Sequence, residues 1–327
     1  MNVSSINPAA KPAAPLISRQ WLIEYSMPLA YVVLFAVLAV TVENFFSVSN
    51  VVGLMLSVAQ IGMVACTMML CLASRDFDLS VGSTIAFAGV LGAIVLEHSG
   101  SVALAVGAGL AAGALIGALN GVLIAYLRVN ALIATLATML MVRGLAFIVS
   151  QGQAVGINSD AFIDFGDTRI YGMPLPVLIC ACCFVVFGIL LNQTVFGRNT
   201  LAIGGNPEAA RLAGVRVERL RVWIFLLQGL VTAMAGLILA SRITSGQPNA
   251  AQGFELDVIS ACVLGGVSLQ GGKARIFGVL IGVLIMGTVE NVMNLMDVDA
   301  FYQYLMRGVI LLVAVLLDQL KTRGDRH

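Results

Sequence analysis

Charge is scarce in this sequence: only 11% of its 327 residues are charged, whereas 59% are hydrophobic. It holds three lysines and two histidines, and no basic tract alternates with aromatic residues. Nucleic-acid binding usually needs a basic patch or stripe of that kind, so a nucleic-acid partner is not expected. The net charge of +1 by itself points to no other partner.

Motifs that carry enzyme or nucleotide chemistry are also missing. No H-E-x-x-H sequence occurs, and the six cysteines lack the spacing of metal ligands. The closest approach to a G-x-x-x-x-G-K-[ST] phosphate loop ends at Gly272-Lys273, where Val267 replaces the first glycine. Ala274 replaces the final hydroxyl residue of that loop. We therefore expect no catalytic residue, no metal site and no bound cofactor in this chain.

Long apolar runs fill most of the sequence, and its mean hydropathy is +0.98. About 20 apolar residues suffice to cross the hydrocarbon core of a bilayer. The runs at 28–42 and 257–269 are short for a full span, so we expect them to be tilted, re-entrant or longer than these bounds. We predict an all-α polytopic membrane protein with about ten transmembrane segments, near residues 28–42, 50–73, 80–97, 102–127, 131–150, 174–191, 222–240, 257–269, 276–296 and 302–318.

The basic residues indicate the orientation of these segments. If both termini are cytoplasmic, 14 of the 18 lysines and arginines fall on the cytoplasmic side, and only Arg169 and Arg242 fall outside. This asymmetry is the positive-inside pattern, and it requires an even number of spans. The start of the chain carries no small-residue cleavage site. We therefore expect a cytoplasmic tail at 1–27, a transmembrane domain at 28–318 with a large cytoplasmic loop at 192–221, and a cytoplasmic tail at 319–327.

One stretch of that loop, GGNPEAARLAGV at 204–215, is unusually polar for this chain. Gly204 and Gly205 allow unusual backbone angles, and Asn206 is a good helix N-cap. Glu208 complements the helix dipole in the first turn, and Gly214 is a typical helix end. The stretch therefore predicts a short surface helix with sharp ends, in which Ala209 and Ala210 present a smooth face. From these residues alone, an ordinary capped loop helix and a docking site are equally good readings.

Small residues also recur at helical spacing inside one apolar run. Gly113, Gly117 and Gly121 fall four residues apart and so share one helix face. Such a face lets two helix backbones approach closely in a membrane. The pattern predicts a tightly packed helix bundle.

Three charged residues lie within predicted spans: Arg143, Glu290 and Arg307. Charges in a membrane usually pair with each other or face the protein interior. We expect a structural ion pair of Glu290 with Arg307, while pairing of Glu290 with Arg143 and a place on a polar transport route remain alternatives. Asn120, Asn291 and Asn294 are candidates for the same route or for bonds between helices, and Asp76 and Asp78 lie in a turn where Asp78 can cap the next helix.

Several motifs together resemble one family of transport proteins. Glu208-Ala209-Ala210, followed after three residues by Gly214, is similar to the EAA…G signature of ABC-importer permeases. SRDFDLSVGS at 74–83, FGRNTLAIGGNPEAARLAGV at 196–215 and ELDVISACVLGGVSLQGG at 255–272 resemble motifs of the branch that imports ribose, galactose and arabinose. The likeness covers roughly residues 20–320, and the segments CLASRDFDLSV, RGLAFIVSQGQAVGI, ASRITSGQP and GTVENVMNL are most similar to members that import L-arabinose.

The resemblance implies a function and a set of partners. It implies a multi-pass permease in the bacterial inner membrane, with ATP bound and hydrolysed by a separate ABC ATPase subunit. A periplasmic binding protein would deliver the monosaccharide, and a second copy of the chain would complete the channel. Coupling to the ATPase is then expected at Gly204, Gly205, Asn206, Glu208, Ala209, Ala210 and Gly214.

Alternatives remain at this point. Ribose or galactose is the alternative sugar, and a self-sufficient secondary transporter is the alternative from another class. The family often has a further glycine after its GG pair, but here Gly271 and Gly272 are followed by Lys273 and Ala274. If position 274 had a positive φ, alanine would be strained there, which puts the shape of this turn in doubt.

Overall fold

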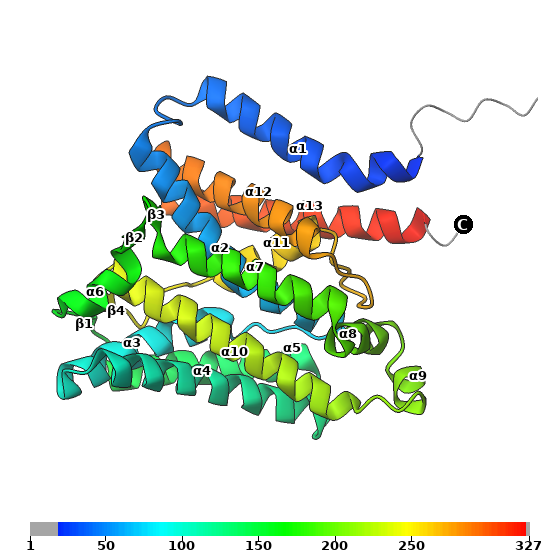
Figure 1. The fold of residues 1–327 in the computed structure, drawn as a ribbon, viewed down its shortest axis with the longest axis horizontal. Coiled ribbons are helices and arrows are strands. Elements are labelled where there is room, and N and C mark those ends of the chain that lie inside the picture. The colour runs from blue at the N-terminus through cyan, green and yellow to red at the C-terminus, as the bar shows by residue number, and fades with distance from the viewer. Residues whose placement is uncertain (1–18, 325–327) are drawn as a thin grey trace, which may run out of the picture.

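Helices make up most of the chain in a computed structural model, which describes residues 19–324, with side chains described from 27 to 316 and at 319 (Figure 1). The helices follow the apolar runs of the sequence, and turn residues separate them. They are α1 (Arg19–Thr41), α2 (Val48–Ala73), α3 (Val81–Ser99), α4 (Val102–Ala125), α5 (Ala131–Val149), α6 (Asp160–Asp167), α7 (Leu175–Gln193), α8 (Val195–Gly205), α9 (Pro207–Leu212), α10 (Val217–Arg242), α11 (Phe254–Leu264), α12 (Ile276–Leu295) and α13 (Ala300–Gly324).

Two pairs of very short strands complete the described secondary structure. Strand β1 (Val155–Gly156) pairs antiparallel with β4 (Ser245–Gly246), and β2 (Arg169–Ile170) pairs antiparallel with β3 (Met173–Pro174). The first pair ties the segment after α5 to the segment after α10. The segment 151–173, between two of the predicted spans, is therefore an ordered structure that also contains α6.

Seven of the described helices are long and apolar enough to cross a membrane: α2, α3, α4, α5, α7, α10 and α12. Two shorter apolar stretches, Met27–Thr41 of α1 and Ala300–Leu316 of α13, accompany them. At about 1.5 Å per residue, the 11 residues of α11 are too short to cross the hydrocarbon core. The polytopic membrane fold is thus confirmed for these helices, and the count of ten spans stays a prediction.

Some predicted boundaries differ from the structure. Helix α1 begins at Arg19, within the tail predicted at 1–27, and its apolar stretch begins at Met27; residues 1–18 and 325–327 of the two expected tails lie outside the described residues. Helix α10 begins at Val217, so the end of the loop predicted at 192–221 is helical. The charged residues near the start of α10 masked this extension, because they interrupt the apolar pattern.

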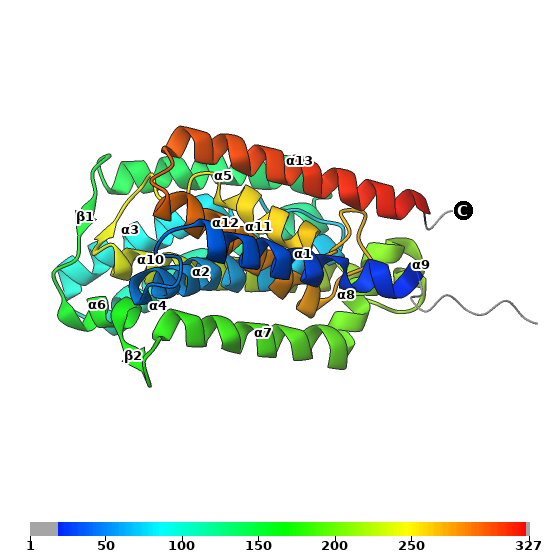
Figure 2. The same cartoon turned by 90° about the horizontal axis from the view of Figure 1, so that it is seen from above.

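Helix α2 lies at the centre of the bundle. Every residue from Ile61 to Ala73 in it is buried, and α7, α10, α11 and α12 pack around it. Helices α3, α4 and α5 form a layer beside α10, while α1 and α13 lie on the outside near α12 (Figures 1 and 2). The central position of α2 matters for the site below, because the end of this helix meets the polar segment around α8 and α9.

The glycine stripe of α4 packs against α10, as its spacing predicts. A Cβ atom added at Gly113 would lie 2.4 Å from the carbonyl oxygen of Gly229. One added at Gly117 would lie 2.1 Å from the carbonyl oxygen of Phe225, and one at Gly121 would lie 2.7 Å from the Cα of Val222. Since real Cβ atoms do not approach a backbone so closely, only glycine allows this contact between the two helices.

We expect Gly117→Leu to destabilise the fold strongly, by about 3 kcal/mol, because the new side chain would force α4 away from the backbone of α10. Thermal unfolding of the detergent-purified protein measures this effect. Gly107→Leu is the matched control, because Gly107 is an exposed glycine of the same helix and a Cβ there would meet nothing within 4 Å. Equal melting temperatures for the two variants would contradict the packing argument.

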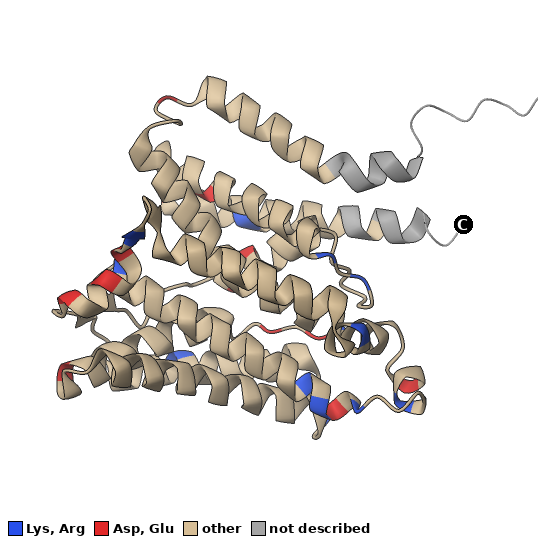
Figure 3. Cartoon of the chain, viewed as in Figure 1, with Lys and Arg blue, Asp and Glu red and all other residues tan. Residues whose placement is uncertain are grey.

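Charged residues gather at the two ends of the bundle (Figure 3). Helices α8 and α9, the start of α10 and the loop between α11 and α12 lie at one end, together with the start of α1 and the end of α13 (Figure 1). We call this the basic end, since its described loops and helix ends carry Arg75, Arg128, Arg198, Arg211, Arg216, Arg219, Arg221, Lys273 and Arg275. Helix α6 and the short strands lie at the opposite end (Figure 1).

Candidate functional site

The polar segment after α7 folds into two short helices at the basic end. Thr194 caps α8 by accepting a hydrogen bond from the Gly197 N–H, at 3.3 Å. Asn206 caps α9, and its Oδ1 accepts from the N–H groups of Glu208 and Ala209, both at 3.0 Å. Capping of this kind satisfies N–H groups that a short helix leaves without partners. The predicted N-cap and short helix are confirmed.

The end of α9 also has the predicted form. Gly214 has φ +87°, and the next residue, Val215, donates its N–H to the carbonyl of Ala210 at 3.0 Å. A left-handed glycine followed by such a backward bond is a common helix stop. An exposed ion pair between Arg211 and Glu218 then connects α9 to the start of α10.

Two details of this segment differ from the sequence prediction. Gly204 and Gly205 end α8 instead of forming a turn of unusual backbone angles, and neither has a positive φ. The two alanines do not share one outer face either: Ala209 is exposed, whereas Ala210 is buried with Ile203 and Val217. Adjacent helical residues point about 100° apart, so only one of them can face outward in so short a helix. The outer face of α9 presents Glu208, Ala209 and Leu212, and Leu212 is 91% exposed.

Gly204 brings the end of α8 into direct backbone contact with the rest of the bundle. A Cβ atom at this position would lie 1.8 Å from the carbonyl oxygen of Ala73, the last residue of α2, and 2.4 Å from the Gly272 nitrogen. Those two groups are hydrogen bonded to each other, with the Gly272 N–H donating to Ala73 at 2.9 Å. The backbones of α2, α8 and the loop after α11 therefore meet at one point, which we call the glycine junction (Gly204, Gly272 and Ala73).

The junction also settles the shape of the turn that lacks a third glycine. Gly271 and Gly272 have φ values of +78° and +75°, and Ala274 is not among the described residues with positive φ. The left-handed positions thus coincide with the two glycines that are present, and alanine at 274 is unstrained. The contact of this turn with Gly204 could not be predicted from the sequence.

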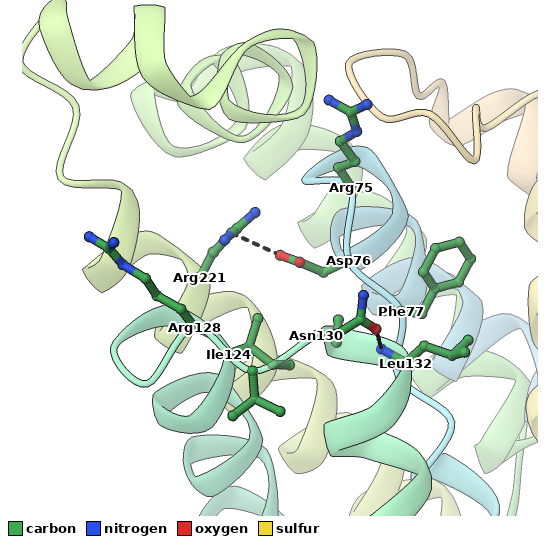
Figure 4. A pocket seen from close by; sticks show the side chains of 10 residues that line it. Arg75, Asp76, Phe77, Ile124, Arg128, Asn130, Leu132 and Arg221 are labelled. Atoms are coloured by element: carbon green, nitrogen blue, oxygen red, sulfur yellow. Dashed lines mark hydrogen bonds and ion pairs between the residues drawn. The ribbon is translucent and has the colours of Figure 1, made fainter.

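Asp76 lies just beyond the junction, in the segment that joins α2 to α3. Its Oδ2 is 3.0 Å from Nε of Arg221 on α10, and both side chains are largely buried (Figure 4). Burial raises the pKa of Asp76 to about 6, and the charge of Arg221 opposes that rise. This pair ties the α2–α3 segment to the start of α10, next to α9.

Asp78 begins a chain of buried hydrogen bonds instead of capping α3 directly. Its Oδ1 accepts from the N–H of Ser80 at 2.9 Å and from the Ser80 hydroxyl at 2.6 Å. Asn120 donates to the same hydroxyl at 3.0 Å and accepts from the Thr138 hydroxyl at 2.7 Å. Asn120 is fully buried in this network, where it links α3, α4 and α5.

The charged residues within the bundle lie toward the opposite end and pair differently from the simplest prediction. The predicted pair of Glu290 and Arg307 is present, with 3.9 Å between the closest oxygen and nitrogen. Arg307 has a closer partner, Asp257 on α11, at 3.3 Å. Asp257 lies in the ELDVISACVLGG block that carried the family resemblance. It shares the first turn of α11 with Glu255, and the sequence gave no sign that it pairs with Arg307.

Arg143 pairs with backbone carbonyls instead of Glu290. Its guanidinium donates to the carbonyls of Pro248 at 2.8 Å and Ala250 at 2.7 Å, and so holds the segment before α11. Asn294 is exposed and accepts a hydrogen bond from Gln303 at 3.1 Å. Asn291 is buried, and its Oδ1 has no hydrogen-bond partner in the described part of the chain, which leaves it available to a polar ligand.

The arrangement offers mechanical connection and polar surface but no cluster for metal chemistry. Among the described residues, no group of three or more His, Cys, Asp or Glu side chains is placed to hold a metal ion. The glycine junction joins the end of α8 to the end of α2, and Arg221 joins the start of α10 to the α2–α3 segment.

Comparison with known proteins gives a consistent picture. The family described as branched-chain amino acid transport system / permease component matches residues 50–315. The chain is 54% identical to the L-arabinose transport system permease protein AraH of Escherichia coli (strain K12), over 93% of this chain and 92% of that protein. It is 53% identical to the L-arabinose ABC transporter permease protein AraH of Azospirillum brasilense, over 91% and 88%. The ribose import permease protein RbsC of Escherichia coli (strain K12) is 40% identical, over 93% and 96%. No solved structure matches the chain.

Proposed function

Because the chain belongs to the family of branched-chain amino acid transport system / permease components, we propose that it is the membrane-spanning permease subunit of an ATP-driven, binding-protein-dependent sugar importer in a bacterial inner membrane, with L-arabinose as its sugar. The observation that carries this is the identity of 53–54% to two L-arabinose permeases over nearly the whole chain, against 40% to a ribose permease. The chain is a translocation subunit and not an enzyme.

The orientation we propose places the basic end in the cytoplasm. The start of α1 and the end of α13 both lie at that end (Figure 1), and this fits an even number of crossings. Basic residues concentrate there (Figure 3), as the positive-inside pattern requires. The ten crossings we propose are the seven long apolar helices, α1, α13 and the segment from β4 through α11, in which α11 itself covers only part of the bilayer thickness.

The partners follow from the two ends. We propose that the ATPase subunit, which binds ATP, docks on the outer face of α9, where Glu208, Ala209 and Leu212 are exposed. The periplasmic binding protein would dock at the opposite end, on the ordered segments around α6 and β4. A second copy of the chain would cover apolar surface that the monomer leaves open, since the most apolar 18 residues of α4, of α5 and of α7 are each only 28% buried.

The transport cycle we propose uses the backbone contacts of the glycine junction. Movement of the ATPase subunits displaces α9, and α8 transmits this displacement to the ends of α2 and α11. Because α2 is buried along half of its length, a shift at its end must repack the helices around it. Coupling then depends on ATP binding favouring one packing of the bundle over the other. We propose Arg143, Glu290, Asn291, Asn294 and Arg307 as the polar groups nearest to the sugar route.

Uptake of labelled L-arabinose tests the function. Cells without other pentose importers would carry this chain with its ATPase and binding protein, and each partner would be omitted in turn. We expect uptake only when all three are present, with unlabelled arabinose as the effective competitor. Competition by ribose or galactose alone would make that sugar the substrate, and the proposal of an ATP-driven importer would stand. Uptake without the ATPase would contradict the proposal in favour of a secondary transporter.

The cap of α9 gives a graded test of coupling. We expect Asn206→Ala to lower ATP-driven uptake several-fold, because the loss of two hydrogen bonds costs a short helix about 1 kcal/mol. Asn206→Asp keeps an accepting oxygen and is expected to stay close to wild type. Uptake and sugar-stimulated ATP hydrolysis should fall together in the alanine variant at unchanged membrane levels. Equal uptake in the two variants would show that the cap has no part in coupling.

A further inference from the structure

A cavity of about 480 Å³ lies at the basic end, beside the ion pair of Asp76 and Arg221. The α2–α3 segment, the end of α4, the start of α5 and the start of α10 enclose it (Figure 4). Arg75, Arg128 and Arg221 line it together with Asp76, Phe77 and Asn130. Nothing in the proposed transport cycle uses this cavity.

The charges of the cavity favour an anion over a neutral sugar. Three arginines and one carboxylate line it; Asp76 lies 3.0 Å from Nε of Arg221 and accepts a hydrogen bond from the Ser74 hydroxyl at 3.4 Å. Within the described part of the chain, the side chains of Arg75 and Arg128 form no hydrogen bond and no ion pair, and the charge of Glu218 acts on Arg128 only at longer range. The cavity therefore keeps a surplus of positive charge at its mouth.

The backbone at two of these arginines supports a role for their side chains. Arg75 has φ +72° and Arg128 has φ +56°, in the left-handed region that glycine adopts at no steric cost. An arginine at such a position carries backbone strain, and strain of this kind tends to persist where the side chain is needed. Both arginines lie in connecting segments, where glycine would adopt the same backbone conformation without strain.

The surroundings of the cavity indicate a ligand at the membrane surface. Tyr126, Leu127 and Val129 flank Arg128 and are exposed. Tyrosine and aliphatic residues beside arginine are typical of the boundary between headgroups and hydrocarbon. Basic pockets between transmembrane helices at this depth suit anionic lipid headgroups. The side chain of Asn130 is already engaged in capping α5, at 3.0 Å from the Leu132 nitrogen, so the arginines supply the donors.

We propose that this cavity binds a phosphate group, presented by the headgroup of an anionic phospholipid or by a free phosphate ion. Guanidinium groups match the geometry of phosphate oxygens and bind them in bidentate fashion. An occupant would compete with Asp76 for Arg221, and thereby act on the segment that follows the glycine junction. The site thus regulates the bundle independently of which sugar is transported.

The test measures ligand-dependent thermal stability of the full-length detergent-purified protein. The variant is Arg75→Gly with Arg128→Gly, which removes two charges and relieves two positive-φ strains, so its melting temperature without ligand is expected to match wild type or exceed it. One arm titrates phosphatidylglycerol against phosphatidylcholine, and a second arm titrates inorganic phosphate. Arg198→Gln is the matched control, because Arg198 is an exposed arginine of the basic end outside the cavity.

We expect wild type and Arg198→Gln to be stabilised at the same ligand concentration, and the double variant to require at least about ten times more, equivalent to the loss of about 1.4 kcal/mol of binding. If wild type and the double variant differ in the lipid titration alone, the ligand is a phospholipid headgroup. If they differ in the phosphate titration, the ligand is the free phosphate ion. Identical titrations for all three proteins in both arms would overturn the proposal. So would stabilisation that appears only on adding the ATPase subunit, since it would indicate an acidic protein contact. None of these outcomes depends on arabinose uptake.

Discussion

Gly204→Ala is expected to abolish ATP-driven uptake while the protein remains in the membrane. The added methyl group would lie 1.8 Å from the carbonyl oxygen of Ala73, and it would wedge apart the hydrogen bond between Ala73 and Gly272. Gly204 has no positive φ, so alanine introduces no backbone strain. Alanine is also the better helix former, by about 1 kcal/mol, and so would strengthen α8 locally. A loss of function therefore has to come from the glycine junction.

The neighbouring glycine provides the control for this experiment. Gly205 is also the end of α8, but a Cβ atom there would meet nothing within 4 Å. We expect Gly205→Ala to transport as wild type does. Arabinose uptake, ATP hydrolysis and the amount of membrane-inserted protein would be measured for both variants. Normal uptake by Gly204→Ala, or an equal defect in Gly205→Ala, would remove the junction from the coupling mechanism.

Neutralising Arg307 is expected to have the second large effect, on stability. This arginine faces Asp257 at 3.3 Å and Glu290 at 3.9 Å, and the side chain of Asp257 is only 5% exposed. Removing one partner of a buried ion pair costs about 3–5 kcal/mol, because the remaining charge is left without compensation. We expect Arg307→Met to lower the yield of folded protein and its melting temperature by a correspondingly large amount.

The choice of a second substitution distinguishes the two acidic partners. Arg307→Met with Asp257→Asn should recover much of the lost stability, because no uncompensated charge remains next to the missing guanidinium. Arg307→Met with Glu290→Gln should recover less, since Glu290 is the more distant and more exposed partner. Melting temperatures of the three variants check this order. Better recovery with Glu290→Gln would make Glu290 the principal partner, as the sequence alone suggested.

Much of the candidate site could be read from neighbouring residues. The capped helix α9 follows from Asn206, Pro207 and Gly214, because caps and stops act over three to five residues. The stripe of Gly113, Gly117 and Gly121 predicted a close helix contact, since helical periodicity places all three on one face. The partner helix of that contact, α10, could not be predicted, because spacing says nothing of what lies opposite.

The sequence by itself determined where the helices of this protein lie, which end carries its basic residues and which family it belongs to. Hydropathy, caps and charge asymmetry are local quantities, and a single chain displays them without folding. The tertiary structure alone decided how those parts are connected. Arg143 holds carbonyls more than 100 residues away, Arg307 prefers Asp257 to Glu290, and Gly204 meets Ala73 and Gly272. Each of these contacts joins segments that only packing brings together, so no local pattern could specify them.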